Sequence, residues 1–181
     1  PKIYPQTLRG SHKFSVYVGQ DGILYFAFSK RELNWYDDVD DLSIKLIKNN
    51  KVLKTDTVPD DGIYDGKFGR ALSIPEKFVM DLKDLEPGAY EISVDTDEDV
   101  LLTNIMSRNS KIVVERDIFL VNNSIYGVPT DTISIFTYSP RLFSTSYHDS
   151  NDQDIYINGE KYSLATLQDF ESLELMSNVL N

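Results

Sequence analysis

The sequence lacks the residues on which most side-chain catalysis depends. It contains no cysteine and only two histidines, His12 and His148. Without cysteine the chain forms neither disulfides nor thiolate metal sites. No HExxH or GxSxG string is present either. Because nucleophiles and general acid–base groups are scarce, we favour a non-catalytic role, with a carbohydrate-active enzyme domain as the alternative.

Positive charge and long apolar runs are also scarce. Lysine and arginine number 18 against 29 aspartates and glutamates, which gives a formal net charge of −11. A chain this acidic repels phosphate backbones, so we predict no nucleic-acid partner. No apolar run approaches the roughly 20 residues of a membrane helix, which predicts no membrane span. The chain opens with Pro1 and shows no signal-peptide pattern, so we interpret it as a processed form or a piece of a larger protein.

The clearest pattern in the sequence is that of strands. The eleven tyrosines and nine phenylalanines favour strands over helices. Residues 85–94 read LEPGAYEISV, in which Pro87-Gly88 is a turn pair followed by alternating apolar and polar residues. A weaker alternation precedes the turn in residues 77–82. Two strands around a Pro-Gly corner are therefore expected.

Similar alternation predicts most of the other strands, and turn residues predict three hairpins. The first hairpin joins residues 12–18 to 23–28 through the turn 19–22. The second joins a strand that begins at Leu42 to residues 51–57 through Asn49-Asn50. The third joins residues 155–157 to 161–164 through Asn158-Gly159. Further strands are expected over residues 100–106, 111–114, 118–121, 132–138 and 141–145. Residues 30–41 and 58–74 are expected to be loops.

The spacing of strands and turns predicts an all-β fold, an antiparallel β-sandwich of jelly-roll-like type. At the C-terminus, Leu164, Leu167, Phe170 and Leu173 have helical spacing, whereas Leu173 and Leu175 fit a final strand. We favour a short helix or an irregular segment over a final strand. No linker composition marks a boundary, which predicts one β-rich unit over residues 1–181; the alternative is a subdivision near residue 100, into 12–99 and 100–181.

Residues 12–95 resemble the prepeptidase C-terminal (PPC) type of β-sandwich domain. The resemblance is carried by an aromatic strand FSVYV, an apolar strand ILYFAF, an Asp-rich loop leading into DLSIKLIKNNKVL, and the corner EPGAYEISV. Domains of this type occur on secreted bacterial and archaeal hydrolases, where they often bind calcium and serve as accessory, substrate-adhering modules. The resemblance therefore implies an extracellular or cell-surface location. The strand-rich chain after Asp99 departs from this layout.

Two acidic loops are the candidate metal site. The first carries Asp37, Asp38, Asp40 and Asp41, and it is expected to face Asp60, Asp61 or Asp65 of the second. Carboxylate oxygens on flexible loops suit calcium, so Ca²⁺ is the predicted ion. The alternative is an acidic surface that holds only water.

Trp35 and Tyr36 are the candidate ligand-binding residues, because aromatic rings in a loop can stack on sugar rings while neighbouring acids accept hydrogen bonds from hydroxyl groups. The alternative for Trp35 is core packing at the open end of the sandwich. Together these features predict a non-catalytic binding or structural module of a secreted or cell-surface protein, stabilised by calcium and adhering to a glycan or to another protein. A structural subunit of a surface layer, appendage or virion is a further alternative.

Overall fold

The computed structural model describes residues 1–4, 7–35, 39–64, 72–109 and 112–115, and the backbone of four short strands after residue 140. The chain divides into two compact units, Pro1–Ile133 and Ser134–Asn181. Within the described residues all regular structure is β-strand, which confirms the all-β prediction. None of these residues forms a helix with the length and apolar character needed to cross a membrane.

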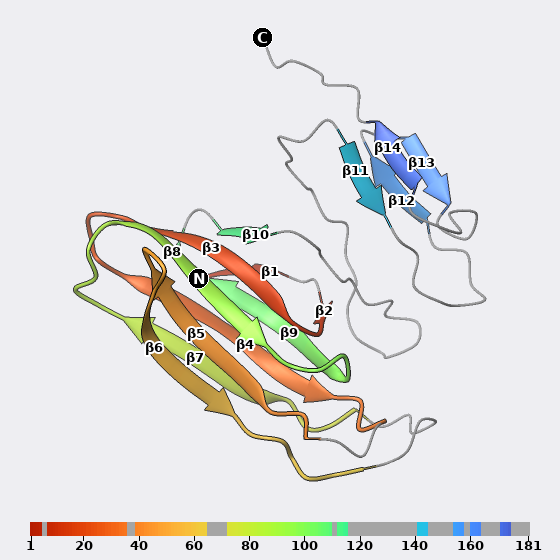
Figure 1. The fold of residues 1–181 in the computed structure, drawn as a ribbon, viewed down its shortest axis with the longest axis horizontal. Helices are drawn as coiled ribbons and strands as arrows, with labels where there is room; N and C mark the ends of the chain where they lie inside the picture. The colour runs from red at the N-terminus through yellow and green to blue at the C-terminus, as the bar shows by residue number, and fades with distance from the viewer. Residues whose placement is uncertain are drawn as a thin grey trace. The chain divides into compact units, whose positions relative to one another are not determined.

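The described part of the first unit forms two antiparallel sheets (Figure 1). Sheet A has the order β1 (Lys2–Tyr4), β9 (Val100–Ser107), β4 (Leu24–Glu32) and β7 (Glu76–Leu82), and β2 (Leu8–Arg9) also pairs with β9. Sheet B has the order β10 (Ile112–Glu115), β3 (His12–Val18), β8 (Gly88–Asp95), β5 (Leu42–Lys48) and β6 (Lys51–Val58).

The two sheets pack face to face around one apolar core. Alternate residues of the strands are buried there because successive side chains point to opposite faces. Phe14 of β3 meets Phe26 of β4 with ring centroids 5.0 Å apart, and Phe28 meets Phe78 of β7 at 5.2 Å. This packing confirms the predicted antiparallel sandwich.

The strand pairing is nested in the manner of a jelly roll. Strand β3 pairs with β10, β4 with β9, and β5 with β8. The partners of these three successive strands therefore follow one another in the reverse order along the chain. Strands β6 and β7 depart from this nesting, because β6 forms a hairpin with β5 and β7 pairs with β4. The connections between β3 and β4 and between β7 and β8 therefore cross from one sheet to the other.

One of the three predicted hairpins is wrong. Strands β3 and β4 do not pair, because β3 lies in sheet B and β4 in sheet A. The turn between them docks on the Pro-Gly corner, where the N–H of Leu85 donates to the carbonyl of Gly22 at 3.0 Å. Gly22 has φ = +65°, and a Cβ there would lie 2.9 Å from the Leu85 carbonyl oxygen, so the contact requires glycine.

The other two hairpins are confirmed. Strands β5 and β6 pair around Asn49 and Asn50, which have φ of 51° and 62° and so supply the left-handed conformation of a tight hairpin turn. In the second unit, β12 (Asp154–Ile157) pairs with β13 (Glu160–Ser163). Ile157 lies opposite Glu160, the register that a two-residue connection requires.

The Pro-Gly corner is a tyrosine corner. The hydroxyl of Tyr90, a buried residue of β8, donates to the backbone carbonyl of Glu86 at 2.8 Å. The Lys48 ammonium lies 3.2 Å from the same hydroxyl and 4.8 Å from the ring centroid. The hydrogen bond fixes the path of the chain as it leaves sheet A and enters sheet B.

In the second unit, β11 (Arg141–Ser144) pairs with β14 (Glu171–Glu174). Leu173 therefore lies in a strand, so the favoured short helix or irregular segment is wrong at this residue and the alternative of a final strand is right. Residues 164–170 and the strands expected over 118–121 and 132–138 lie outside the described residues. The first compact unit ends at Ile133. Strand β9, which begins at Val100, lies inside sheet A between β1 and β4.

Candidate functional site at the loop end

Three connections leave the same end of the sandwich, which we call the loop end (Figure 1). Their described residues are 33–35 and 39–41 after β4, 59–64 and 72–75 after β6, and 96–99 after β8. The strand register brings them together, because Glu32 pairs with Val100 and Leu42 pairs with Val58. The two sheets are joined here by the Lys30 ammonium of β4, which donates to the carbonyl of Pro59 at 2.8 Å.

Strand β4 reaches further into the loop end than the sequence predicted. A loop was expected from Lys30 onward, but β4 continues to Glu32 because it pairs with β7 on one side and β9 on the other. Its inward-facing stripe therefore runs from Phe26 and Phe28 to Lys30 and Glu32. An apolar stripe that ends in two charged residues places a charged pair between the sheets.

Lys30 and Glu32 form a buried ion pair. Their side chains are 1% and 3% exposed, and the ammonium contacts the Glu32 carboxylate as well as the Pro59 carbonyl. Burial raises the pKa of Glu32, because removing a carboxylate from water disfavours its charged form. The Lys30 charge lowers that pKa in part, and the nearby Asp61 raises it again.

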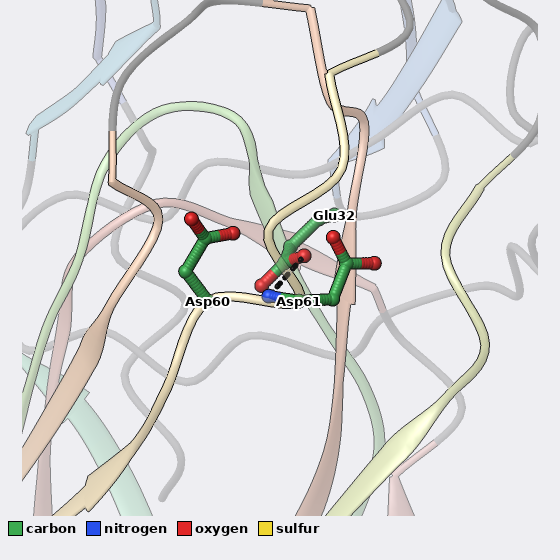
Figure 2. Close-up of side chains that lie close together, drawn as sticks. All are labelled: Glu32, Asp60 and Asp61. Atoms are coloured by element: carbon green, nitrogen blue, oxygen red, sulfur yellow. Dashed lines mark hydrogen bonds between the residues drawn. The ribbon is translucent and has the colours of Figure 1, made fainter.

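Three carboxylates converge beside this pair. Glu32, Asp60 and Asp61 each offer one oxygen atom such that all three lie within 4.8 Å of one another. Figure 2 shows the Glu32 carboxylate between the two aspartates, with the N–H of Asp61 donating to Glu32 Oε2 at 3.4 Å. These are the side chains in the described part of the chain that are grouped closely enough to hold a metal ion together.

The loop backbone holds the two aspartates in place. Asp60 Oδ1 accepts from the N–H of Gly62 at 3.1 Å, and Asp61 Oδ1 accepts from the N–H of Ile63 at 2.8 Å. Such side-chain turns are local and depend on the Asp side chains themselves. Each carboxylate keeps a second oxygen that can bind a ligand.

The structure brings together some of the residues that were predicted to bind a metal ion. Asp60 and Asp61 lie in the cluster, and Asp41 joins the two loops because its Oδ1 accepts from the Asp60 N–H at 2.9 Å. Asp40 is buried, at 2% exposure, and lies outside the three-carboxylate group. Asp37, Asp38 and Asp65 lie outside the described residues.

Two residues of the loop end were missed in the sequence analysis. Glu32 was assigned to a loop, although the alternation from Leu24 to Glu32 would have placed it on the inward face of β4. Asn34 has φ = +55°, and its buried amide Oδ1 has no hydrogen-bond partner among the described residues. A buried oxygen in this state is suited to accept from a water molecule or to bind a cation.

Trp35 is engaged in packing. Its backbone N–H donates to Asp99 Oδ2 at 2.9 Å, and the Arg9 guanidinium lies 5.6 Å from its ring centroid. The ring also packs on the cluster formed by the buried Leu33 and Leu101. The Trp35 side chain is thus partly buried, while Tyr36 lies outside the described residues.

The loop end thus combines a buried Lys–Glu pair with two loop aspartates, of which Asp60 is half-buried and Asp61 is exposed. Formally, three carboxylates and one ammonium leave two negative charges at this place. That charge and the oxygen donors suit a divalent cation. No protein-family model, curated protein or solved structure matches this chain.

Proposed function

We propose that this chain is a non-catalytic binding or structural module of a secreted or cell-surface protein, and that calcium stabilises its loop end. The observation that carries the proposal is the convergence of Glu32, Asp60 and Asp61 within 4.8 Å. The PPC-like layout of residues 12–95 supports the same role, since such domains are accessory modules.

Calcium is favoured over other ions by the nature of the donors. All are hard oxygens, and two of the three come from a loop that can adjust to the six to eight ligands that calcium takes. The Lys30 ammonium contacts Oε1 of Glu32, so the other oxygen, Oε2, is the one that lies toward Asp61. Water and nearby amide or backbone oxygens would complete the coordination shell.

Melting curves with calcium and with a chelator test this proposal. A ligand that binds only the folded state raises stability by about 2.7 kcal/mol at a hundredfold excess over its dissociation constant, so the melting temperature should rise by several degrees. The double substitution Asp60→Asn and Asp61→Asn keeps the side-chain shape but removes two charges, and it should abolish the shift. Asp81→Asn on β7 is the matched control, because Asp81 is exposed and lies outside the cluster.

Identical curves for the wild-type chain in calcium and in chelator would refute the calcium part of the proposal. The aspartates would then belong to an acidic surface that holds only water. A shift that persists in the double variant would place the ion elsewhere in the chain.

Adhesion to a glycan is the narrower part of the proposed role. The loop carboxylates can accept hydrogen bonds from sugar hydroxyls, whereas the Trp35 ring already packs against Arg9. Binding to a panel of immobilised polysaccharides tests it, and binding that is lost in the Asp60→Asn, Asp61→Asn variant would support it. Equal binding by wild type and variant would place any glycan site away from these loops.

One observation favours a carbohydrate-active enzyme as the second candidate. Glu32 has a raised pKa and lies beside Asp61, and glycosidases use one protonated and one ionised carboxyl group. Against this, Glu32 is buried and paired with Lys30, which leaves it poorly placed to protonate a glycosidic oxygen. Hydrolysis of a polysaccharide substrate that disappears in both Glu32→Gln and Asp61→Asn would make the enzyme the better candidate.

A further inference from the structure

Among the described strands, each sheet of the sandwich ends in two edge strands, which pair with a neighbour on one side only. Sheet A is bounded by β1 and β7, and sheet B by β10 and β6. Strands β1 and β10 contain three and four residues, so neither offers a long ladder to another strand. Strands β6 and β7, with eight and seven residues, are long enough to pair with a further strand along their length.

Strand β6 carries two features that oppose further pairing. Lys54 and Asp56 lie on the same face of the strand as the buried Val58. Inward-facing charges disfavour the addition of a strand, because the added strand would remove them further from water. The register of β6 with β5 also shifts between Leu46 and Ile47, and such irregularities bend an edge.

Strand β7 has a regular edge. Its register with β4 is continuous from Glu76 to Leu82, and the one charged residue of its inward face, Glu76, is the exposed first residue of the strand. Phe78 and Met80 of that face are buried, whereas Val79 of the outward face is 43% exposed. Apart from the ladder to β4, residues 76–82 make no backbone hydrogen bond to any described residue. A long, regular edge of this kind is a template for pairing with another chain.

The outward face of β7 is complementary to itself. It carries Lys77, Val79 and Asp81 in that order, and all three side chains are exposed. Neither Lys77 nor Asp81 forms an ion pair within the part of the chain that the structure describes. When two β7 strands run antiparallel with Val79 at the centre, Lys77 of each copy lies opposite Asp81 of the other. Opposite charges in directly opposed positions stabilise a strand pair.

The same register suits the inward face. It places Phe78 of each copy opposite Met80 of the other, so two apolar side chains meet on either side of the centre. Only the end pair, Glu76 opposite Leu82, combines a charged with an apolar residue. One register therefore matches the charged residues of one face and the central apolar residues of the other.

We propose that two copies of this chain associate through β7, with the strands antiparallel and Val79 of each copy at the two-fold axis. Sheet A of one copy then continues into sheet A of the other. Because the contact is two-fold, it uses the β7 edge of both copies and closes at a dimer. This association depends neither on calcium nor on the proposed binding role.

The net charge of the chain works against the association. Two copies that each carry a formal charge of −11 repel one another. At about 0.15 M salt the Debye length is ~8 Å, so repulsion between distant charges is largely screened. Directly opposed side chains have Cβ atoms about 4.5–5.5 Å apart, which keeps the two Lys77–Asp81 pairs inside that length. The association is therefore best measured at this ionic strength.

Sedimentation of the full chain over a concentration series up to about 1 mM measures the association. We expect a reversible equilibrium between monomer and dimer. Lys77→Glu and Asp81→Lys each place like charges opposite one another on both sides of the two-fold axis, so each should weaken the dimer about tenfold or more. A wild-type chain that stays monomeric throughout the series would overturn the proposal.

A mixture of the two variants tests the register itself. The Lys77→Glu strand has two negative charges on its outward face and the Asp81→Lys strand has two positive ones, so both cross-strand pairs are complementary in a mixed dimer. We expect a heterodimer at concentrations at which each variant alone is monomeric. Both variants remain net negative, so overall charge does not favour mixing. Failure of the mixture to associate would overturn the proposed pairing.

Lys51→Glu is the matched control, because it makes the same charge change at an exposed position of the other long edge strand, β6. It should dimerise as the wild type does, and melting curves show that each variant is folded. Equal weakening by Lys51→Glu and Lys77→Glu, or a dimer that none of the variants weakens, would overturn the β7 contact.

The concentration series is repeated in calcium and in chelator to separate this proposal from the calcium site. A dimer that forms in both conditions, without a calcium-dependent melting shift, would support the β7 contact and refute only the calcium proposal. A dimer that forms only in calcium would overturn the β7 contact as proposed, because no part of that contact requires the ion.

Discussion

The Lys30 ammonium is paired with the carboxylate of Glu32, two residues further along the inward face of β4. Both side chains continue the stripe that begins with Leu24, Phe26 and Phe28, so an ion pair occupies the end of the core. The Lys30 ammonium also donates a hydrogen bond to the carbonyl of Pro59, which lies in the loop after β6 of the opposite sheet. The pair therefore helps to close the sandwich and to position Asp60 and Asp61.

We expect Lys30→Met to destabilise the chain by about 3–5 kcal/mol, since removing one partner of a buried ion pair leaves the other charge unpaired. The double variant Lys30→Met, Glu32→Leu removes both charges and should recover much of this loss. Urea unfolding near neutral pH measures both values. A double variant no more stable than the single one would show that the unpaired carboxylate is not the source of the loss.

The same pair predicts a pH dependence. The folded-state pKa of Glu32 is raised, so the stabilisation that its protonated form contributes is present at low pH and is lost as pH rises through that pKa. In Lys30→Met the missing cation should raise the pKa further, and the destabilisation should shrink as pH falls. A loss of stability that is constant from neutral to acidic pH would contradict this.

His12 should make the chain less stable in mild acid. It is buried, with Nδ1 3.0 Å from the Gly10 carbonyl oxygen, and burial lowers its pKa below the ordinary value of 6.5. Below that value the unfolded chain binds a proton that the folded chain does not, so stability is lost as pH falls through 6.5 toward the folded-state pKa. On acidification the wild type should lose stability relative to His12→Phe in urea unfolding, whereas a difference that is constant with pH would contradict the prediction.

The tyrosine corner gives a sharper test of the fold. Tyr90→Phe removes the hydroxyl that donates to the Glu86 carbonyl at 2.8 Å and should cost about 1–2 kcal/mol. Tyr17→Phe on β3 is the control, because Tyr17 is exposed, and it should change stability by less than about 0.5 kcal/mol. Equal effects of the two substitutions on the free energy of unfolding would show that the corner bond is not stabilising.

Asn109 joins three strand ends at the opposite end of the sandwich from the loop end. Its Oδ1 accepts from the Tyr25 N–H at 3.1 Å, and its Nδ2 donates to the carbonyls of Ile23 at 2.9 Å and Tyr17 at 3.3 Å. Asn109→Asp replaces the donating amide by a carboxylate and should destabilise the chain by about 3 kcal/mol or more, because the two carbonyls lose their donor. A stability equal to that of the wild type in urea unfolding would refute this role.

Local sequence determined most of the strands and two of the turns. The alternation in His12–Val18 and in Leu42–Lys48 was enough to locate β3 and β5, since a strand with one buried face needs a period of two. Asn49 and Asn50 determined a hairpin because a tight turn needs positive φ at both positions, which asparagine tolerates. These features depend only on residues close together in the chain.

The tertiary structure alone decided which strands pair and which acids meet. Gly19–Gly22 looked like a hairpin turn, but β3 pairs with β8 and β10, which are distant in the sequence. Glu32 joined Asp60 and Asp61 only because β4 continues between β7 and β9 and faces the loop after β6. Such contacts arise from packing two sheets on one core, and no local pattern encodes which distant segment supplies the partner.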